Sequence, residues 1–426
     1  MADLGNVVRC SDVVIHRRSE LDCRVMTRVV RVRPLGVWTA AVAVLLACGA
    51  EPLVPSDPVT EPFAAVAAGT LHSCGLTVSG VAFCWGWNAD GEIGDGSLGD
   101  RPRPVLVATP VRFALLSGGG AHTCGRTSSG AGHCWGLNLS GQLGSGAATN
   151  RSLVPTDVAG GVTLRHISAG GSFSCGIAAD STARCWGWNA FGQIGDLSRT
   201  DRRTPVPVAG GLRLLFVYTG TWHSCGIAAD SSAFCWGRNA NGQLGDGTTA
   251  DTAGPVAVQG GLKFVAVTAG SYHSCGLTAG GDAYCWGRGD FGQLGDSANG
   301  SNTPDLVRGG HTFVAISAGA THTCGLTSSN EAFCWGSGDS GQLGTSTALA
   351  VCQTSNAGSQ PCSLVPVPVS GSLSFAALTS GLHHTCGVTT AGTAYCWGLN
   401  DHGQLGDGSG RASTVPVRVA NQDAVP

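Results

Sequence analysis

One phrase of fifteen residues occurs seven times along the 426-residue chain, and it constrains the fold more than any other feature. The first copy is HSCGLTVSGVAFCWG, at residues 72–86, and every copy has two cysteines ten positions apart. A recurrence of this kind is typical of supersecondary units that bury their apolar faces against one another. The period is about 50 residues, with one longer gap, as the Cys-Trp-Gly tryptophans show: Trp85, Trp135, Trp186, Trp236, Trp286, Trp335 and Trp397.

Each repeat contains four short apolar runs. In the unit that starts at residue 255 these are residues 255–258, 263–268, 273–277 and 282–286, and glycine-rich turns separate them. No helical period of useful length is present. Four strands repeated seven times predict an all-β fold, a seven-bladed β-propeller of four-stranded blades, over residues 63–420.

The two ends of the repeat region suggest how the ring closes. The first repeat begins at residues 63–69 (FAAVAAG) with no PVxV-like strand before it, and the last ends with an additional strand, VPVRV, at residues 415–419. We expect this C-terminal strand to join blade one, because closure removes exposed sheet edges.

Sixteen of the nineteen cysteines fall into eight neighbouring pairs. In the first hairpin, Gly80 suits the left-handed last position of a three-residue turn, and that register sets Cys74 opposite Cys84. Directly opposed cysteines lie close enough to bridge. In an exported protein the pattern predicts a disulfide framework, with the pairs Cys74–Cys84, Cys124–Cys134, Cys175–Cys185, Cys225–Cys235, Cys275–Cys285, Cys324–Cys334, Cys352–Cys362 and Cys386–Cys396. In two hairpins Ser181 and Ser231 stand where glycine is expected, and we expect those turns to differ.

A metal site is the alternative use of these cysteines. His72, Cys74 and Cys84 are residue types that zinc prefers, but seven identical open sites around one chain would be unusual. Asp90 belongs to a stretch that faintly resembles a calcium loop, yet the other repeats lack its acidic set, so a tight turn is the simpler interpretation. We therefore predict neither a metal nor a cofactor.

The N-terminal segment has the pattern of an export signal. After Met26, arginines precede an apolar run at residues 37–46, which is too short to span a bilayer and typical of a signal peptide. The sequence LLAC that follows resembles the lipobox of bacterial lipoproteins, and that resemblance implies lipidation of Cys48. We predict a signal peptide at residues 26–47 and an extracytoplasmic location in the bacterial envelope, at the outer membrane or cell surface.

The remaining short segments have simpler interpretations. Residues 1–25 fit no signal pattern and indicate a start codon assigned too early. Residues 48–62 are proline-rich and predict a tether after the lipidated cysteine, and residues 421–426 form a tail.

Charge excludes two classes of partner. Charged residues make up 12% of the chain, the formal net charge is −3, and lysine occurs once, at Lys263. A weakly acidic surface without a basic run does not favour nucleic acid or an anionic membrane. Membrane contact is therefore expected only through the lipid anchor.

The repeats resemble those of the regulator of chromosome condensation family, with the pattern HTxxLTxxGxVxxWG followed by NxxGQLG. The resemblance covers all seven units and implies a propeller. The paired cysteines, an insertion at residues 352–362 and Phe173 in place of histidine depart from the pattern. Guanine-nucleotide exchange, the activity of the founding member, is not expected because it acts on a nuclear GTPase.

Residues that recur in nearly every repeat are expected to be structural. The repeated tryptophans are predicted to pack between blades. Buried hydrogen bonds between blade strands are predicted for six histidines: His72, His122, His223, His273, His322 and His384.

Residues that differ between repeats are the candidates for function. Three loop positions vary: the one after Trp-Gly, the one three residues later, and the one three residues before the first cysteine. Aromatic and arginine side chains there are typical of protein-recognition surfaces, although such residues could instead pack locally over the blade ends. The candidate binding residues are Trp87, Trp188, Phe191, Trp222, Arg238, Tyr272, Arg288 and Phe291.

No catalytic motif is present: the chain has no GxSxG serine motif, HExxH or phosphate-binding P-loop. We predict a lipid-anchored, non-catalytic module that binds another protein. The alternatives are binding of an envelope glycan, with Trp87, Trp188 and Trp222 stacking on sugars, and a passive structural role at the surface.

Overall fold

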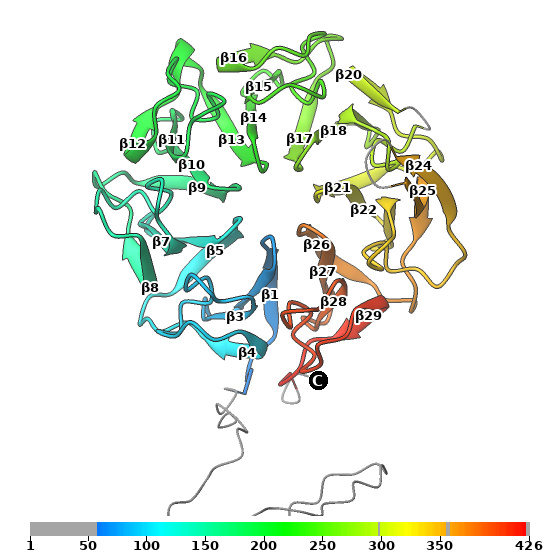
Figure 1. Ribbon diagram of the computed structural model, residues 1–426, viewed down its shortest axis with the longest axis horizontal. Coiled ribbons are helices and arrows are strands. Elements are labelled where there is room, and N and C mark those ends of the chain that lie inside the picture. The colour runs from blue at the N-terminus through cyan, green and yellow to red at the C-terminus, as the bar shows by residue number, and fades with distance from the viewer. Residues whose placement is uncertain (1–57, 297–298, 355–357, 423–426) are drawn as a thin grey trace, which may run out of the picture. The chain divides into compact units, whose positions relative to one another are not determined.

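The computed structural model describes residues 58–296, 299–354 and 358–422. These residues form 29 strands and one short 3-10 helix, η1 (Ala209–Gly211). The strands make seven antiparallel sheets arranged around a central axis (Figure 1), which confirms the all-β, seven-bladed propeller. Within the same ranges, no helix is long and apolar enough to cross a membrane.

Each blade is built from strands that follow one another in the chain, with the first next to the axis (Figure 1). Six blades have four strands in sequence order, and the sixth has five in the order β21-β22-β23-β25-β24. Blade one consists of β1 (Phe63–Ala68), β2 (His72–Thr77), β3 (Ala82–Gly86) and β4 (Arg101–Leu106). The strands of blades two to four are β5 (Phe113–Gly118), β6 (His122–Thr127), β7 (Gly132–Leu137), β8 (Arg151–Asp157), β9 (Leu164–Ala169), β10 (Phe173–Ala178), β11 (Ala183–Gly187), β12 (Arg202–Pro207), β13 (Leu214–Thr219), β14 (His223–Ala228), β15 (Ala233–Gly237) and β16 (Thr252–Ala257). Those of blades five to seven are β17 (Phe264–Ala269), β18 (His273–Thr278), β19 (Ala283–Arg288), β20 (Gly300–Leu306), β21 (Phe313–Ala318), β22 (His322–Thr327), β23 (Ala332–Ser337), β24 (Ala350–Thr354), β25 (Gly358–Pro368), β26 (Phe375–Ser380), β27 (His384–Thr389), β28 (Ala394–Gly398) and β29 (Ser413–Arg418).

The prediction that the C-terminal strand joins blade one is wrong. Strand β29 pairs with β28 in its own blade, with Cys396 opposite Val417, and blade one has four strands of its own. The sequence repeat was assigned to start one strand too early. The PVxV strand is the last strand of a blade, at the rim, and does not open the next blade. Consecutive antiparallel strands joined by short connections pair with one another. This holds in every blade except the sixth, where the inserted β24 lies outside β25 and β23 pairs with β25.

The ring closes by repeating a contact that the other blade pairs also make. The first residue of each innermost strand donates its main-chain N–H to a carbonyl in the hairpin turn of the preceding blade. Phe113 N lies 2.8 Å from Gly80 O, and across the closure Phe63 N lies 2.9 Å from Gly392 O. Closure is therefore non-covalent and needs no exchanged strand.

The cysteine hairpins have the predicted register. Cys74 lies opposite Cys84, and Gly80 adopts a φ of 83° in the turn. In this and the six equivalent hairpins the bridged Cα atoms lie 4.0–4.1 Å apart. The structure contains all eight pairs that the spacing predicts, including Cys352–Cys362, whose Cα atoms are 5.7 Å apart.

The turns at Ser181 and Ser231 do not differ, which corrects the expectation for them. Both serines adopt a φ of 66°, and Ala178 N donates to Thr182 O at 2.9 Å, as in the glycine hairpins. The aspartate before each serine explains this. Asp180 accepts hydrogen bonds from the main-chain N–H and the hydroxyl of Thr182, at 3.0 and 2.6 Å, and such side-chain bonds hold a turn without glycine.

The repeated histidines and tryptophans join neighbouring blades, as predicted. At the interface of blades one and two, Thr123 Oγ1 donates to Glu92 O at 2.8 Å. The hydroxyl must therefore accept from His72 Nε2, 2.8 Å away. Trp135 Nε1 donates to the same Glu92 oxygen at 2.8 Å. A histidine–hydroxyl bond of this kind occurs at six of the seven interfaces.

These six histidines are uncharged near neutral pH. Burial lowers the pKa of His72 to about 4 and that of the other five to about 3. At the seventh interface Phe173 occupies the histidine position, and Ser224 keeps its bond to Gln193 O, at 3.1 Å, without a histidine partner.

Candidate interaction face

The three variable loop positions lie at the same end of every blade. Strand direction alternates, so the β1–β2 and β3–β4 connections and their equivalents leave the blades together; we call this end the loop face. The first and third positions are joined by main-chain hydrogen bonds, for example Arg238 N to Trp222 O at 3.0 Å and Arg288 N to Tyr272 O at 2.9 Å. Residues that are far apart in the repeat are therefore neighbours on this face.

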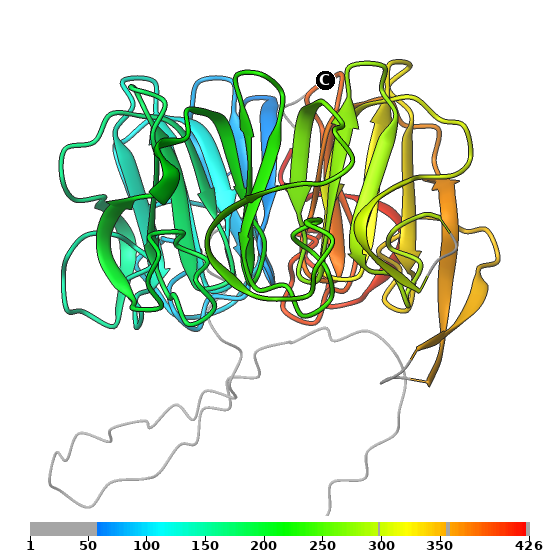
Figure 2. The ribbon, with the colours of Figure 1, turned by 90° about the horizontal axis from the view of Figure 1, so that it is seen from above.

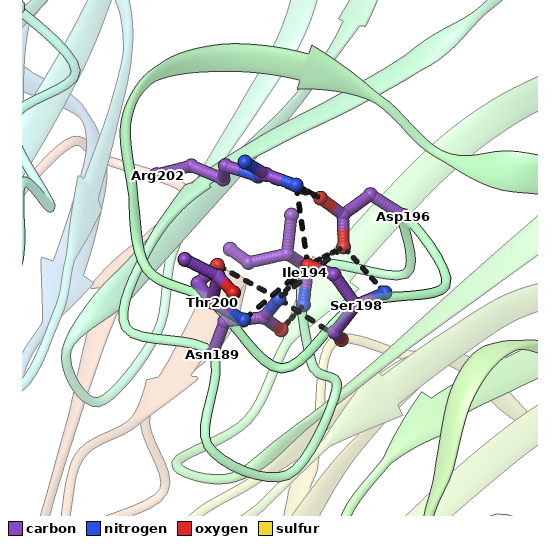
Figure 3. Close-up of polar contacts among 6 residues, drawn as sticks. All are labelled: Asn189, Ile194, Asp196, Ser198, Thr200 and Arg202. Atoms are coloured by element: carbon purple, nitrogen blue, oxygen red, sulfur yellow. Dashed lines mark hydrogen bonds and ion pairs between the residues drawn. The ribbon is translucent and has the colours of Figure 1, made fainter.

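An asparagine supports the longer loop of most blades, shown for blade three in Figure 3. Asn189 Oδ1 accepts the N–H of Ile194 at 3.0 Å, and Asn189 Nδ2 donates to the carbonyls of Ser198 and Thr200, each at 3.1 Å. The asparagine side chain thus satisfies main-chain N–H and C=O groups of the loop that have no partner in a neighbouring strand. Blades one, two, four and seven use the equivalent residues Asn88, Asn138, Asn239 and Asn400.

The aspartate of this loop is fully engaged by its neighbours. Asp196 accepts from the hydroxyl of Ser198 at 2.7 Å and from Arg202 Nε at 2.7 Å (Figure 3). Burial opposes ionisation, but these bonds hold the pKa of Asp196 below its usual value. The loop aspartate therefore holds a turn. Within the ranges that the structure describes, no group of three or more His, Cys, Asp or Glu side chains is placed to hold a metal ion.

Four of the predicted binding residues form one group across two blades. The ring of Trp188 contacts those of Phe191 and Trp222, with centroids 5.3 Å apart in both cases. The Arg238 guanidinium lies 4.8 Å from the Phe191 ring centroid and 5.9 Å from that of Trp222. All four side chains are half-buried. We call these residues the blade 3–4 cluster.

The three predicted residues of blade five form a second group. Arg288 lies 4.8 Å from the ring centroid of Phe291 and 5.5 Å from that of Tyr272. Its Nε and Nη2 donate to the two carboxylate oxygens of Asp290, at 2.6 and 2.7 Å. Phe291 is only 8% exposed, so it supports Arg288 from below. The sequence analysis missed Asp290, although an aspartate two residues after a loop arginine is a readable signal.

Trp87 belongs to neither group. It lies at the junction of blades one and seven, where its ring meets that of His402 edge to face, with centroids 4.2 Å apart. His402 Nδ1 lies 2.9 Å from Asp100 Oδ2. The eight predicted residues therefore occupy one face but fall into three separate places on it.

The insertion in blade six extends the loop face. Strands β24 and β25 form a hairpin that projects beyond the neighbouring strands (Figure 2). Gln353 of this hairpin lines a cleft of about 490 Å³ together with Asn241, Arg288, Asp290, Asn299, Gly287 and Gly300. The insertion at residues 352–362, bridged by Cys352–Cys362, thus contributes Gln353 to a polar cleft.

The axis of the propeller is narrow and lined by small residues. A hollow of about 80 Å³ lies where the seven innermost strands turn, and among the described residues no acidic, basic or thiol side chain lines it. Main-chain bonds link the blades there, as in Thr70 N to Gly119 O at 3.0 Å. A Cβ on Gly119 would stand 2.7 Å from Gly170 O, so glycine is required for this close approach.

A buried carboxyl beneath the loop face was also missed. Glu92 is fully buried where the other six blades have glutamine. It accepts the N–H of Asp90 at 2.9 Å, as Gln142 accepts that of Ser140 at 3.0 Å. Burial raises the pKa of Glu92 to about 7. The sequence signal was GEIG in place of GQLG.

Comparison with known proteins shows the family and the fold. Prp20p of Saccharomyces cerevisiae matches at 23% identity and a TM-score of 0.72, over 81% of this chain and 87% of that chain. Human WBSCR16 matches at 21% identity and 0.69, over 80% and 94%. The ectodomain of the receptor kinase CR4 from Physcomitrella patens matches at 23% and 0.51, over 79% and 74%. No curated protein sequence matches the chain.

The regulator of chromosome condensation (RCC1) repeat pattern matches most of the propeller. One description of the repeat covers residues 79–125, 129–177, 230–277, 280–326, 329–388 and 391–425. A second covers residues 63–92, 164–193, 216–243, 264–293, 313–342 and 375–404. The chain therefore belongs to the regulator of chromosome condensation (RCC1) repeat family.

Proposed function

We propose that the protein is a non-catalytic binding module of the bacterial envelope, outside the cytoplasm and lipid-anchored through Cys48, which recognises another protein through the loop face. One observation carries the proposal. The aromatic and arginine residues that vary between blades gather on a single face, and most of them remain half-exposed there. Trp, Tyr and Arg are the residues that most often dominate the binding energy of protein interfaces.

The cysteines support the proposed setting. Eight disulfides, one in every hairpin and one in the insertion, indicate an oxidising environment. Signal peptide and lipid anchor rest on the sequence alone, because residues 26–47 and Cys48 lie outside the described residues, as do residues 1–25 and most of the tether and tail.

The family supports a protein partner at the level of the fold. Prp20p has been studied for its binding to Gsp1p and histones, and its complex with Kap60 is known. This precedent concerns the fold and not this surface. Nucleotide exchange is not part of the proposal, since so many disulfides would not persist in a reducing nucleus or cytosol.

Glycan binding is the second candidate, and the polar cleft favours it. Asn241, Asn299 and Gln353 bring three amide side chains to one cleft, next to the Arg288–Asp290 pair. Amide side chains donate to sugar hydroxyls and accept from them, and carboxylates accept from them. The experiment below therefore tests envelope proteins and envelope glycans as ligands of the same chain.

The test is affinity capture from native envelope membranes with the oxidised full chain as bait. A Trp188→Ala, Trp222→Ala double variant removes two half-buried rings of the blade 3–4 cluster. A Val78→Ala, Lys263→Ala variant is the matched control, because both residues are exposed at the opposite end of the blades. Comparison of thermal unfolding verifies that all three baits are folded.

We expect a protein that wild type and control retain and the double variant loses, and that binds the purified wild-type chain directly. A protein retained equally by all three baits would refute recognition by this cluster. Capture of purified envelope glycan alone, lost in an Asn241→Ala, Asn299→Ala variant, would favour the second candidate.

A further inference from the structure

Two arginines at the same loop position in adjacent blades have different partners. Arg288 of blade five directs two N–H groups at Asp290, two residues further along its own loop. Arg238 of blade four has Ala240 at that place. Among the residues that the structure describes, no side-chain or main-chain oxygen accepts from the Arg238 guanidinium, whose contacts are with the rings of Phe191 and Trp222.

The geometry leaves the hydrogen-bonding edge of Arg238 unused. A guanidinium carries five N–H donors in a planar fork. Contact with aromatic rings is an electrostatic attraction that uses none of these donors. The two rings therefore position the guanidinium plane of Arg238, and its N–H groups remain available to a hydrogen-bond acceptor.

The acidic residues of blade four do not fill this role, because the loop itself employs them. Asp251 Oδ1 accepts the N–H of Asn239 at 2.7 Å, and Asp246 Oδ1 accepts from Asn239 Nδ2 at 3.1 Å. Both carboxylates hold the turn beneath the loop face. Among the described residues of blade four, no carboxylate is therefore left to accept from Arg238.

Blade five shows which acceptor fits this position. There a carboxylate occupies the arginine fork with both oxygens, in the bidentate arrangement that gives strong and directional recognition. The two blades share the loop position, the main-chain bond to the preceding loop and one ring, Trp222 or Tyr272. The second ring is Phe191 of the preceding blade for Arg238 and Phe291 of the same loop for Arg288. The difference lies in the source of the carboxylate.

We propose that Arg238 binds an aspartate or glutamate side chain of the partner protein, in a segment that lies across the blade 3–4 cluster. The rings of Trp188, Phe191 and Trp222 supply apolar contact on either side of that carboxylate. A protein segment fits better than a small anion, because a net charge of −3 gives no long-range attraction for free anions and the adjoining rings need apolar atoms to contact. This inference rests on the proposed function and names the chemistry of its partner.

The experiment selects binding peptides from a random dodecapeptide library displayed on phage, with the oxidised full chain as target. Selected peptides are then measured on three variants. Arg238→Gln removes the guanidinium, and Ala240→Asp supplies an internal carboxylate as in blade five. Lys263→Gln is the control, because it removes one exposed positive charge at the opposite end of the blades. Ala240 is exposed, so the added aspartate leaves the fold intact, and thermal unfolding verifies this.

We expect selected peptides to be enriched in Asp and Glu, and to bind Arg238→Gln and Ala240→Asp about 10- to 100-fold more weakly, the range for a lost charge-assisted hydrogen bond. Lys263→Gln should bind them as wild type does. Peptides without a carboxylate, no Arg238-dependent peptide, or unchanged binding to Ala240→Asp would each overturn the proposal.

The two proposals fail in different ways. Envelope capture that depends on Trp188 and Trp222 but not on Arg238 would leave the binding module in place and remove the carboxylate contact. Arg238-dependent acidic peptides without any captured envelope protein would retain the contact and contradict the proposed setting.

Discussion

The interface between blades two and three and the one between blades three and four differ in one central residue. In the first, His122 Nε2 meets Ser174 Oγ at 2.8 Å. In the second, Phe173 stands at the histidine position and contributes packing alone. Both interfaces keep the tryptophan bond, from Trp186 Nε1 to Gln142 O and from Trp236 Nε1 to Gln193 O, each at 2.9 Å.

The comparison shows which contact every blade interface keeps and which contact one interface lacks. The tryptophan and its acceptor are present at all seven interfaces, whereas the histidine bond is absent at one. The interface that dispenses with histidine is also the one that carries the blade 3–4 cluster on the loop face. The polar bond is therefore an addition to an interface that packing already holds.

The largest effect is expected from removal of an interface tryptophan. Trp236→Ala empties a fully buried position and should lower the free energy of unfolding by about 3–5 kcal/mol. The loss should equal or exceed that of Trp286→Ala, since the Phe173 interface has no histidine bond to compensate. Denaturant unfolding of the two oxidised variants measures the difference. A smaller decrease in the free energy of unfolding for Trp236→Ala than for Trp286→Ala would contradict the claim that packing stabilises this interface.

Glu92→Gln tests the one interface whose acceptor residue is acidic. The pKa of Glu92 is raised to about 7 in the folded chain, so its protonated form favours folding at low pH and that contribution is lost as pH rises toward 7. The variant should be more stable than wild type by up to roughly 3 kcal/mol at pH 8 and by less than about 1 kcal/mol at pH 5. Unfolding at the two pH values measures it. An equal gain at both would show that Glu92 is not protonated by burial.

His273→Phe copies the Phe173 interface into blade five. The pKa of His273 is lowered to about 3, so only the unfolded chain takes up its proton below pH 6.5, and wild type loses stability as pH falls. The loss between pH 7 and pH 5 should be about 2 kcal/mol smaller in the variant. Phe173→His should enlarge it by a similar amount. An unaltered pH dependence in both variants would mean that these histidines do not titrate on unfolding.

The smallest effect is expected in the hairpin turn of blade four. Ser231 holds a φ of 66° and offers its carbonyl to Phe264 N at 2.8 Å across the interface. Ser231→Gly relieves the strain of the left-handed conformation, but glycine also raises the conformational entropy of the unfolded chain. The free energy of unfolding should therefore rise by at most about 1 kcal/mol. Ser231→Val should lose stability instead, because a β-branched residue is poorly tolerated there. Thermal unfolding ranks the three proteins, and a Val variant as stable as Gly would contradict the assigned turn.

Periodic features of the fold were predictable from the sequence. The four runs of the unit at residue 255 correspond to β16, β17, β18 and β19 within a few residues, and Gly80 was sufficient to set the cysteine register. The strand that opens a blade was not predictable, because in a closed ring of identical units any of the four strands could be first. The first strand of a blade is the one that lies at the axis, and its position there depends on tertiary packing and not on the local sequence.

The candidate site was predictable in kind but not in grouping. Variation between repeats identified Trp188, Trp222 and Arg238, since exposed loop residues escape the constraints of the interface. It could not show that Phe291 is buried or that Trp87 meets His402 of another blade, because both depend on the spacing between blades. The pairing of Arg288 with Asp290 is local and could have been read from two residues.

The central claim is that the loop face of blades three and four contacts a protein partner. The most direct measurement places a photo-cross-linking residue at position 240, beside Arg238, or at position 78 in the opposite turn, and irradiates native envelopes. The account predicts a cross-linked protein adduct from position 240 and none from position 78. Adducts from position 78 alone, equally from both positions, or from neither would contradict it.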